Sequence, residues 1–421
     1  MEQLIGMTDT AFMGRVGEIE LGASALAGVY YMIIFMIAFG FSIGSQILIG
    51  RRNGEGEYKE IGSIFYQSLF FLLILAVVLF TISQTFSPYI LKNIIESDNV
   101  YHATVSYINW RVFGFFFSFA GVIFRAFFVG TTQTKTLTLN SIVMVLSNVV
   151  FNYILVFGKL GFPALGIAGA AIGSSLAELI SLIFFIVYTY KKVDYKKYGL
   201  NKLRGIKFTL LKRILNVSLW TMIQNFISMS TWFLFFLAVE HLGERSLAIS
   251  NIIRNVSSLP FMIIIAFAST TSTLISNLIG AGKSEDIWKV IRRTTFMAFS
   301  IIAPMLILFS LFPNLILRIY TNSPELIEAS IPSLWVLCTA YVMLIPGNIL
   351  FQSVSGTGNT RPALLLEFTA LVIYTVYLVY IIFYLKLDVA ICWTTEHVYG
   401  GAIFLFSWIY LKYGKWQNKK I

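Results

Sequence analysis

The sequence is built from long apolar stretches separated by short polar or Gly/Pro-containing segments. A helix of about 20 apolar residues crosses the hydrocarbon core of a bilayer, and these stretches reach that length. We therefore predict an all-α polytopic membrane protein in which eleven stretches form complete helices. Their approximate ranges are 21–50, 60–90, 101–130, 136–158, 165–190, 209–239, 246–279, 287–312, 326–353, 361–385 and 389–412.

The first apolar segment, residues 1–16, is too short to cross a bilayer, since sixteen residues of α-helix rise only about 24 Å. We expect it to be the incomplete remainder of a first helix whose natural start lies upstream. The chain then holds about 11.5 helices. The alternative is a first helix that is naturally short.

Composition excludes a set of soluble domains. Hydrophobic residues make up 57% of the chain and charged residues 12%, whereas soluble domains carry about 25% charged residues. The net charge of +11 comes from short loops between the apolar stretches. There an excess of Lys and Arg marks the cytoplasmic side of a membrane rather than a nucleic-acid-binding face. The distribution over the loops predicts that both termini are cytoplasmic and that no nucleic acid is bound.

Two short motifs recur along the chain at the same interval. The sequence Asn53-Gly54-Glu55-Gly56 resembles Ile279-Gly280-Ala281-Gly282, and residues 130–135 (GTTQTK) resemble residues 356–361 (GTGNTR). Both motifs recur after the same number of residues, and this interval contains six predicted helices. We therefore predict two pseudo-symmetric six-helix bundles with parallel orientation. We predict an N-lobe over 1–190, a basic cytoplasmic linker over 191–208, and a C-lobe over 209–421 that ends in a short basic tail.

Residue patterns typical of enzymes are not found in the sequence. The three histidines, His102, His241 and His397, are far apart, and the chain contains no H-E-x-x-H or G-x-x-x-x-G-K-[ST] motif. Cys338 and Cys392 lie in apolar stretches, which predicts buried thiols rather than a disulfide. We expect no enzyme and no resident cofactor. Active transport by such a chain would draw on an ion gradient.

Acidic residues inside apolar stretches are informative, because a charge at the centre of a membrane helix costs at least about 2.5 kcal/mol. Asp9 is either a carboxylate that binds a proton or an ion, or it is an interfacial acid or a local partner of Arg15. Glu178 is either a second titrating group or an acid satisfied by serines and backbone, and we favour the latter. We interpret Glu367 as marking the cytoplasmic end of a helix, and Glu396 as a weaker candidate in the second half.

Polar residues of two further helices could complete a site around Asp9. Asn148 and Asn152 are four residues apart and share a helix face, so their amides could surround a cation or hydrogen-bond a protonated carboxyl. Alternatively they form interhelical packing contacts, each worth about 0.6 kcal/mol. Tyr107 could donate to the same cluster, or could anchor its helix at the membrane interface.

Several motifs resemble the multidrug and toxic compound extrusion (MATE) family over essentially the whole chain. They are residues 9–17 (DTAFMGRVG), residues 166–171 (GIAGAA), residues 356–362 (GTGNTRP), and the pair Asn148 and Asn152. The resemblance is greatest to the prokaryotic branch related to DNA-damage-inducible efflux proteins. It implies a monomeric transporter in the bacterial cytoplasmic membrane, with six plus six helices. The transporter would export amphipathic, often cationic compounds by H+ or Na+ antiport, with alternating access between the lobes.

The resemblance also assigns residues. In that branch the first-helix acid matches Asp9, the fifth-helix Asn matches Asn148, and the fourth-helix Tyr matches Tyr107. The family often has an Asp one turn after that Asn, where this chain has Asn152, so a Na+ site here would have one carboxylate fewer. Ser174 is the nearest candidate for a sixth-helix hydroxyl. The seventh-helix acid of another branch has no match, and Gln224 lies in that region.

Two other functions are compatible with a polytopic membrane chain. A lipid-linked saccharide flippase of the same superfamily is the first alternative, although such proteins commonly have more helices and a more basic central cavity. A structural membrane protein without transport activity is the second. A long soluble domain or interaction tail would favour it, and the sequence contains neither.

Overall fold

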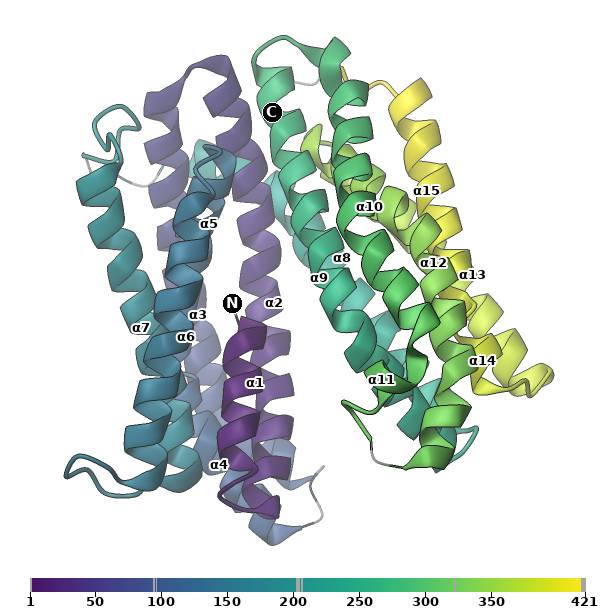
Figure 1. Cartoon of the computed structure of the whole chain (residues 1–421). Helices are drawn as coiled ribbons and strands as arrows, with labels where there is room; N and C mark the ends of the chain where they lie inside the picture. Colours follow the sequence, from purple (N-terminus) through teal and green to yellow (C-terminus); the bar gives the residue numbers. More distant parts are fainter. Residues whose placement is uncertain are drawn as a thin grey trace. The chain divides into compact units, whose positions relative to one another are not determined.

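The computed structural model describes residues 2–93, 95, 97–201, 205, 207–321 and 323–417. Parts of the predicted linker (202–204 and 206) and the end of the predicted basic tail (418–421) lie outside the described residues. All regular elements within the described ranges are helices, and none is a strand. This confirms the all-α prediction (Figure 1).

The chain divides into two compact units. Unit 1 comprises Met1–Asn53 and Glu57–Ser218, and unit 2 comprises Gly54–Gly56 and Leu219–Ile421. The division between them falls inside a helix, a few residues beyond the predicted linker. The assignment of the two halves as repeats of one another stays a prediction.

Unit 1 is formed by the first seven helices and the start of the eighth. Their bounds are α1 Glu2–Met13, α2 Glu18–Glu55, α3 Tyr58–Lys92, α4 Asp98–Arg111, α5 Gly114–Gly130, α6 Lys135–Phe157, α7 Gly166–Lys192 and α8 Phe208–Glu240. The short α1 packs against α6 and α7, which form an extensive helix pair with each other. This packing brings Asp9 to the interior of unit 1.

Unit 2 is organised around one long buried helix. Its remaining elements are α9 Glu244–Gly280, α10 Ile287–Leu311, α11 Pro313–Leu317, α12 Pro324–Gly356, α13 Thr360–Val379, a π-helical turn Tyr380–Tyr384, α14 Val389–Cys392 and α15 Thr395–Tyr413. The α12 helix packs against α9, α10 and α15. Its residues Leu334, Leu337 and Tyr341 lie in the hydrophobic core of the unit.

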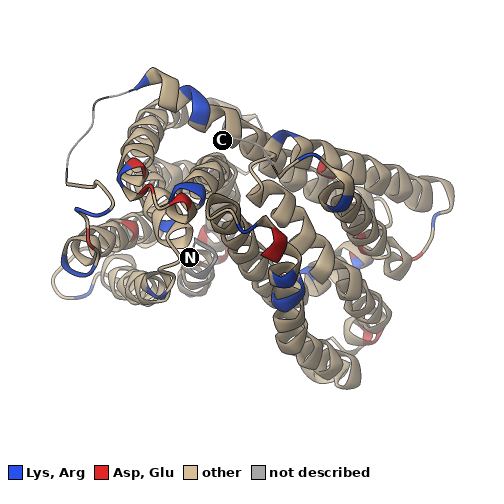
Figure 2. Ribbon diagram, turned by 90° about the horizontal axis from the view of Figure 1, so that it is seen from above, with Lys and Arg blue, Asp and Glu red and all other residues tan. Residues whose placement is uncertain are grey.

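Length and hydropathy single out ten helical segments of the described chain as able to cross a membrane, and an eleventh if α4 and α5 together form one span. We predicted one continuous helix over 101–130, but the pair is bent by 51° at the break. The predicted span therefore corresponds to two helices rather than one, and the break between them follows directly after the charged residue Arg111. In Figure 2 the charged residues, blue for Lys and Arg and red for Asp and Glu, occupy only short parts of the ribbon. This agrees with a charged fraction of 12%.

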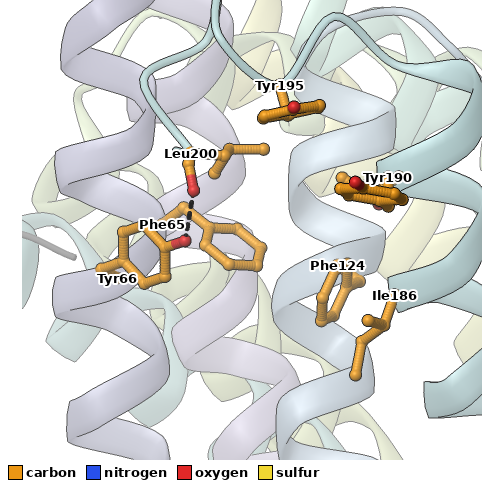
Figure 3. A pocket seen from close by; sticks show the side chains of 8 residues that line it. Phe65, Tyr66, Phe124, Ile186, Tyr190, Tyr195 and Leu200 are labelled. Carbon is orange, nitrogen blue, oxygen red and sulfur yellow. Dashed lines mark hydrogen bonds between the residues drawn. The ribbon is translucent and has the colours of Figure 1, made fainter. Parts of the chain in front are cut away.

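The described part of the segment between α7 and α8 folds back onto unit 1. The Tyr66 hydroxyl of α3 donates to the carbonyl of Leu200 over 2.6 Å, and Gln67 donates to the carbonyl of Gly205 over 2.9 Å. A small open pocket of about 250 Å³ lies beside this contact. Figure 3 shows its mainly aromatic lining, including Tyr195 and Phe124. These contacts attach the linker to the body of unit 1.

Candidate functional site

The Asp9 carboxylate lies buried inside unit 1 rather than at an interface. Its side chain is only 4% exposed, because α1 is packed against α6 and α7. Arg15, the alternative partner, is exposed beyond the end of α1, and no ion pair joins it to Asp9 in the described part of the chain. The interpretation of Asp9 as an interfacial acid paired with Arg15 was therefore wrong.

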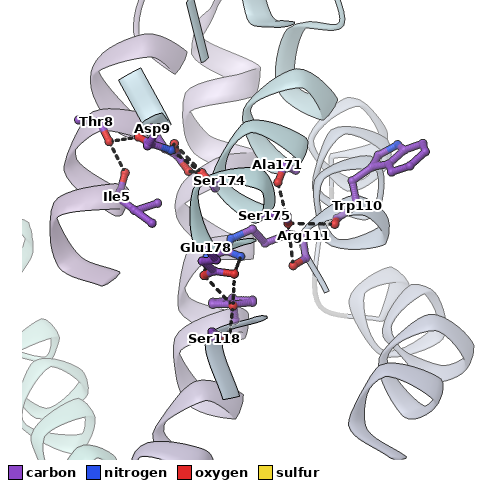
Figure 4. Close-up of polar contacts among 12 residues, drawn as sticks. Ile5, Thr8, Asp9, Trp110, Arg111, Ser118, Ala171, Ser174, Ser175 and Glu178 are labelled. Atoms are coloured by element: carbon purple, nitrogen blue, oxygen red, sulfur yellow. Dashed lines mark hydrogen bonds and ion pairs between the residues drawn. The ribbon is translucent and has the colours of Figure 1, made fainter. Parts of the chain in front are cut away.

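Four side chains from three helices donate hydrogen bonds to Asp9. The Tyr107 hydroxyl of α4 donates to Oδ2 over 2.9 Å. The amides of Asn148 and Asn152 on α6 donate to Oδ1 over 3.2 and 2.7 Å. The Ser174 hydroxyl of α7 lies 2.9 Å from Oδ1 and 2.6 Å from Oδ2. The structure thus brings together Asp9 and the four polar residues that the sequence proposed beside it, and Figure 4 shows Asp9 beside Ser174.

Helix geometry explains how these donors converge. Asn148 and Asn152 are one turn apart and face the same side of α6, and both are fully buried. Gly173 on α7 allows the close approach, since a Cβ at that position would lie 2.5 Å from Asn152 Oδ1. Tyr107 is 3% exposed, so it is a buried donor and not an anchor at the membrane interface.

Two further contacts define the chemistry of this cluster, which we call the Asp9 cluster (Thr8, Asp9, Tyr107, Asn148, Asn152 and Ser174). The Thr8 hydroxyl donates to Asn148 Oδ1, which fixes the orientation of that amide. Asn152 Oδ1 is buried without a hydrogen-bond partner. Beside the Asp9 carboxylate, this amide oxygen is therefore an acceptor that no hydrogen bond occupies and that a proton or a monovalent cation could use.

Glu178 lies in a second buried group, one helical turn beyond Ser174 on α7. Arg111 binds its carboxylate in a bidentate ion pair, with distances of 2.9 and 2.6 Å. The Tyr31 hydroxyl of α2 donates to both oxygens over 2.9 and 3.1 Å, and the guanidinium lies 3.6 Å from the centre of the Tyr31 ring. The expectation that serines and backbone satisfy Glu178 was wrong, because a cation and a phenol do so (Figure 4).

A glycine makes room for this ion pair. A Cβ on Gly114, the first residue of α5, would lie 2.2 Å from a guanidinium nitrogen of Arg111 and 2.3 Å from an oxygen of Glu178. The break between α4 and α5 therefore coincides with the ion pair. The two carboxylates use neighbouring positions of α4 and α7. On α4, Tyr107 binds Asp9 and Arg111, four residues later, binds Glu178. On α7, Ser174 binds Asp9 and lies four residues before Glu178.

Two further acids that the sequence singled out, Glu367 and Glu396, lie in unit 2. Glu367 was expected to mark a helix end, but it lies buried two turns inside α13, at 4% exposure. Glu396 is partly buried in the first turn of α15. Among the described residues, no group of three or more His, Cys, Asp and Glu side chains could hold a metal ion.

Sequence reasoning did not identify Thr8, Tyr31 or Arg111 as members of these groups. Arg111 carried a usable signal, because a cation inside an apolar stretch requires a partner and Glu178 was an available acid. Thr8 and Tyr31 carried none, since hydroxyl side chains are common in membrane helices and neither occurs in a distinctive pattern.

Comparison with known proteins places the chain in a family. The family model described as MatE matches residues 1–154 and 221–381. A probable multidrug resistance protein NorM from Thermotoga maritima is 24% identical over 375 residues, which cover 88% of this chain and 80% of that protein. A probable multidrug resistance protein YoeA from Bacillus subtilis is 24% identical, covering 85% of this chain and 77% of that protein.

Solved structures share the same fold. A MOP superfamily transporter from Pyrococcus furiosus superposes with a TM-score of 0.88 at 20% identity, over 100% of this chain and 95% of that one. An outward-facing multidrug resistance MATE family transporter superposes with a TM-score of 0.87 at 20% identity, over 98% and 94% of the two chains. Since the MatE model covers well over half of the sequence and the fold agrees, the protein belongs to the MatE, or multidrug and toxic compound extrusion, family.

Proposed function

We propose that the chain is a secondary active transporter that exports small amphipathic, often cationic compounds in exchange for H+ or Na+. Support comes from the family and from relatives that are named probable multidrug resistance proteins. The proposed location is the bacterial cytoplasmic membrane, with both termini cytoplasmic and the protein acting as a monomer surrounded by lipid.

The observation that carries the proposal is the burial of Asp9 among uncharged donors only. Tyr107, Asn152 and Ser174 stabilise the carboxylate by hydrogen bonds, but no described Lys or Arg neutralises it. A single charge held in this way can be cancelled by one proton or one monovalent cation without leaving a buried cation unpaired. Asp9 is therefore the group in unit 1 best suited to load and release the coupling ion.

The composition of the Asp9 cluster favours H+ over Na+. Its donors direct hydrogen atoms at the carboxylate, so the hydrogen bonds stabilise the Asp9 charge without a metal ion. A protonated Asp9 needs only one acceptor for its O–H, and the unpartnered Asn152 Oδ1 is an oxygen of the required kind. Rotation of the Asn152 amide would exchange its donor for this acceptor. The amide thus accommodates both protonation states of Asp9.

Coupling requires that the ion and the substrate favour different conformations. We propose that a proton binds Asp9 in an outward-open state, removes the buried charge, and stabilises a rearrangement of α1 that lowers the affinity for the substrate. Substrate release then precedes return to the inward-open state, where Asp9 loses its proton. The two lobes would alternate in access during this cycle.

The flippase alternative is not favoured. The known relatives are named as multidrug resistance proteins, and the arginine of α4 is neutralised by Glu178, so it adds no free positive charge for a lipid phosphate. The structural alternative has no supporting observation.

The test is ethidium accumulation in an efflux-deficient bacterial strain that expresses the chain. Cells are measured with and without a protonophore, and in buffers with and without Na+. We expect less accumulated dye than in vector controls, and loss of this difference when the protonophore is added. The exposed acid Glu240 at the end of α8 supplies a matched control variant, Glu240→Gln, that should behave as wild type.

The result also identifies the ion. Dye efflux that requires Na+ but survives the protonophore would assign Na+ as the coupling ion. Accumulation equal to the vector control under every condition, with the protein present in the membrane, would contradict multidrug efflux by this chain.

A further inference from the structure

The pocket beside the linker contact has no part in the proposed transport cycle. Its walls come from α3, α5, α7 and the segment that follows α7, and aromatic side chains form most of its lining (Figure 3). Phe65 and Phe124 pack edge to face with ring centres 5.0 Å apart. Tyr190 stacks on Tyr195 at 5.5 Å. The pocket therefore lies within unit 1 and offers contacts to an apolar ligand.

An exposed apolar stripe of α7 leads into this pocket. Ile183, Ile186, Val187 and Tyr190 are spaced by three and four residues, so they share one helix face, and they are between 44% and 70% exposed. On a helix that is long and apolar enough to cross a membrane, such a face is suited to contact acyl chains. Ile186 and Tyr190 also line the pocket, so an acyl chain that lies along α7 can enter it.

The size of the pocket favours part of a lipid over an exported drug. Its volume is about 250 Å³, whereas pockets that enclose a drug-sized ligand measure roughly 300–1,000 Å³. An acyl chain is narrow and flexible, and the part of it that does not fit stays among the other chains of the bilayer. No apolar surface is then left in contact with water.

Thr189 of the pocket lining has a buried hydroxyl without a partner. The side chain is 8% exposed, and its hydroxyl oxygen makes no hydrogen bond. A buried polar group in this state is costly, and a ligand oxygen that accepts from the hydroxyl removes the cost. Thr189 lies three residues before the end of α7 at Lys192. The ester carbonyls of a phospholipid are acceptors at the corresponding depth, between the acyl chains and the headgroup.

Positive charge is concentrated directly beyond the pocket. Lys191 and Lys192, the last two residues of α7, are exposed, and no ion pair joins them to an acid in the described part of the chain. Asp194 is the only acid of the segment 191–201, and its carboxylate accepts the backbone N–H of Lys197. Lysines at the end of a membrane helix bind anionic headgroups. The charge at this end of the pocket is therefore complementary to a lipid phosphate.

We propose that this pocket binds an anionic phospholipid of the surrounding bilayer. One acyl chain occupies the aromatic pocket, the Thr189 hydroxyl donates to an ester carbonyl, and Lys191 and Lys192 bind the phosphate. Because Tyr195 and Leu200 line the same pocket, the bound lipid also contacts the segment that connects the two units. Binding requires that the chain lies in a membrane, and it is independent of the coupling ion and of the exported compound.

Native mass spectrometry of the full chain in detergent measures the affinity for phosphatidylglycerol and for phosphatidylcholine with the same acyl chains. We expect the anionic phosphatidylglycerol to bind more tightly than the zwitterionic phosphatidylcholine. The double variant Lys191→Gln with Lys192→Gln should weaken phosphatidylglycerol binding about 30-fold. The matched control is Arg292→Gln with Arg293→Gln, which removes two exposed charges from α10 and should keep the wild-type affinity.

The acyl chain is located with a phosphatidylglycerol that carries a photoreactive diazirine on one chain. In the wild type we expect cross-links to the lining residues of α3 and α7. Ile186→Trp places a larger side chain in the pocket and should abolish these cross-links. Ile183→Trp is the matched control, because Ile183 lies on the same exposed face but outside the lining. Thr189→Val keeps the shape but removes the donor, and should weaken binding about fivefold.

Two sets of results would overturn the proposal. The headgroup assignment fails if the wild type binds both lipids equally, or if the lysine double variant keeps its affinity or loses no more than the arginine control. The pocket assignment fails if cross-links spread over the exposed faces of unit 1 and persist in Ile186→Trp. Such cross-links would show a lipid of the general bilayer contact only.

Discussion

The two buried carboxylates of unit 1, Asp9 on α1 and Glu178 on α7, have binding partners that lie one turn apart on α4, yet they are stabilised in opposite ways. Asp9 is held by hydroxyl and amide donors, whereas Glu178 forms a bidentate ion pair with Arg111. Removing the charge of Glu178 would leave a guanidinium alone in the interior, which is strongly unfavourable. Removing the charge of Asp9 leaves only neutral groups. Burial alone therefore does not identify a titrating acid, and the charge of its partners does.

The largest effect is expected from breaking the ion pair. Arg111→Met leaves Glu178 buried and uncompensated, which should destabilise the protein by about 3–5 kcal/mol. The double variant Arg111→Met with Glu178→Met removes both charges and should regain most of this stability. Thermal unfolding of the detergent-purified variants measures both effects. A single variant as stable as wild type would show that the ion pair does not determine the stability of this region.

A smaller effect is expected within the Asp9 cluster. Tyr107→Phe removes a hydrogen bond to a charged group, worth about 1.5–3 kcal/mol. The lost bond stabilised the carboxylate form of Asp9, so the pH profile of efflux by the variant should shift relative to that of the wild type. The pH dependence of ethidium efflux measures this shift.

The control for that experiment is Tyr153→Phe, which changes an exposed tyrosine on α6. It should leave the pH profile unchanged. A Tyr107→Phe profile that coincides with wild type would contradict the role of Tyr107 in stabilising the charged form.

The smallest effect comes from the packing that supports Asn152. Gly173→Ala introduces a Cβ that would lie 2.5 Å from Asn152 Oδ1, so the amide or α7 must move. Overpacking of this kind costs about 1–3 kcal/mol, and the displaced amide should weaken pH-dependent efflux in parallel. Gly121→Ala is the matched control, because a Cβ there meets nothing within 4 Å. Equal melting temperatures and equal efflux for the two variants would contradict the account of Gly173.

The membrane-spanning architecture could be predicted from the sequence because bilayer thickness fixes how long an apolar helix must be. The ten candidate spans of the described chain follow from that rule. The bend between α4 and α5 could not be predicted, because it coincides with the ion pair of Arg111 and Glu178, whose meeting requires a tertiary contact. Apolar run lengths carry no information on such a contact.

The candidate site, too, could be predicted from the sequence only in part. The i, i+4 spacing of Asn148 and Asn152 indicated a shared face. Asp9 stood out as an acid in an apolar stretch with Tyr107 as a possible donor, and the family resemblance added Ser174, but the sequence did not show that all of them converge on one carboxylate. Glu367 was misinterpreted as a helix end because its position relative to Arg361 suggested one. Its contacts with Ser228 and Tyr399 become visible only when α8 and α15 are packed against α13.

The most direct test of the central claim, that Asp9 carries the coupling ion, is ethidium transport in proteoliposomes under an imposed pH gradient. The account predicts gradient-driven transport for the wild type, reduced transport for Asp9→Glu, and none for Asp9→Asn. Asp9→Asn should still bind ethidium, as measured by fluorescence polarisation, because only the titrating group is lost. Transport by Asp9→Asn with the same dependence on the pH gradient as the wild type would contradict the claim.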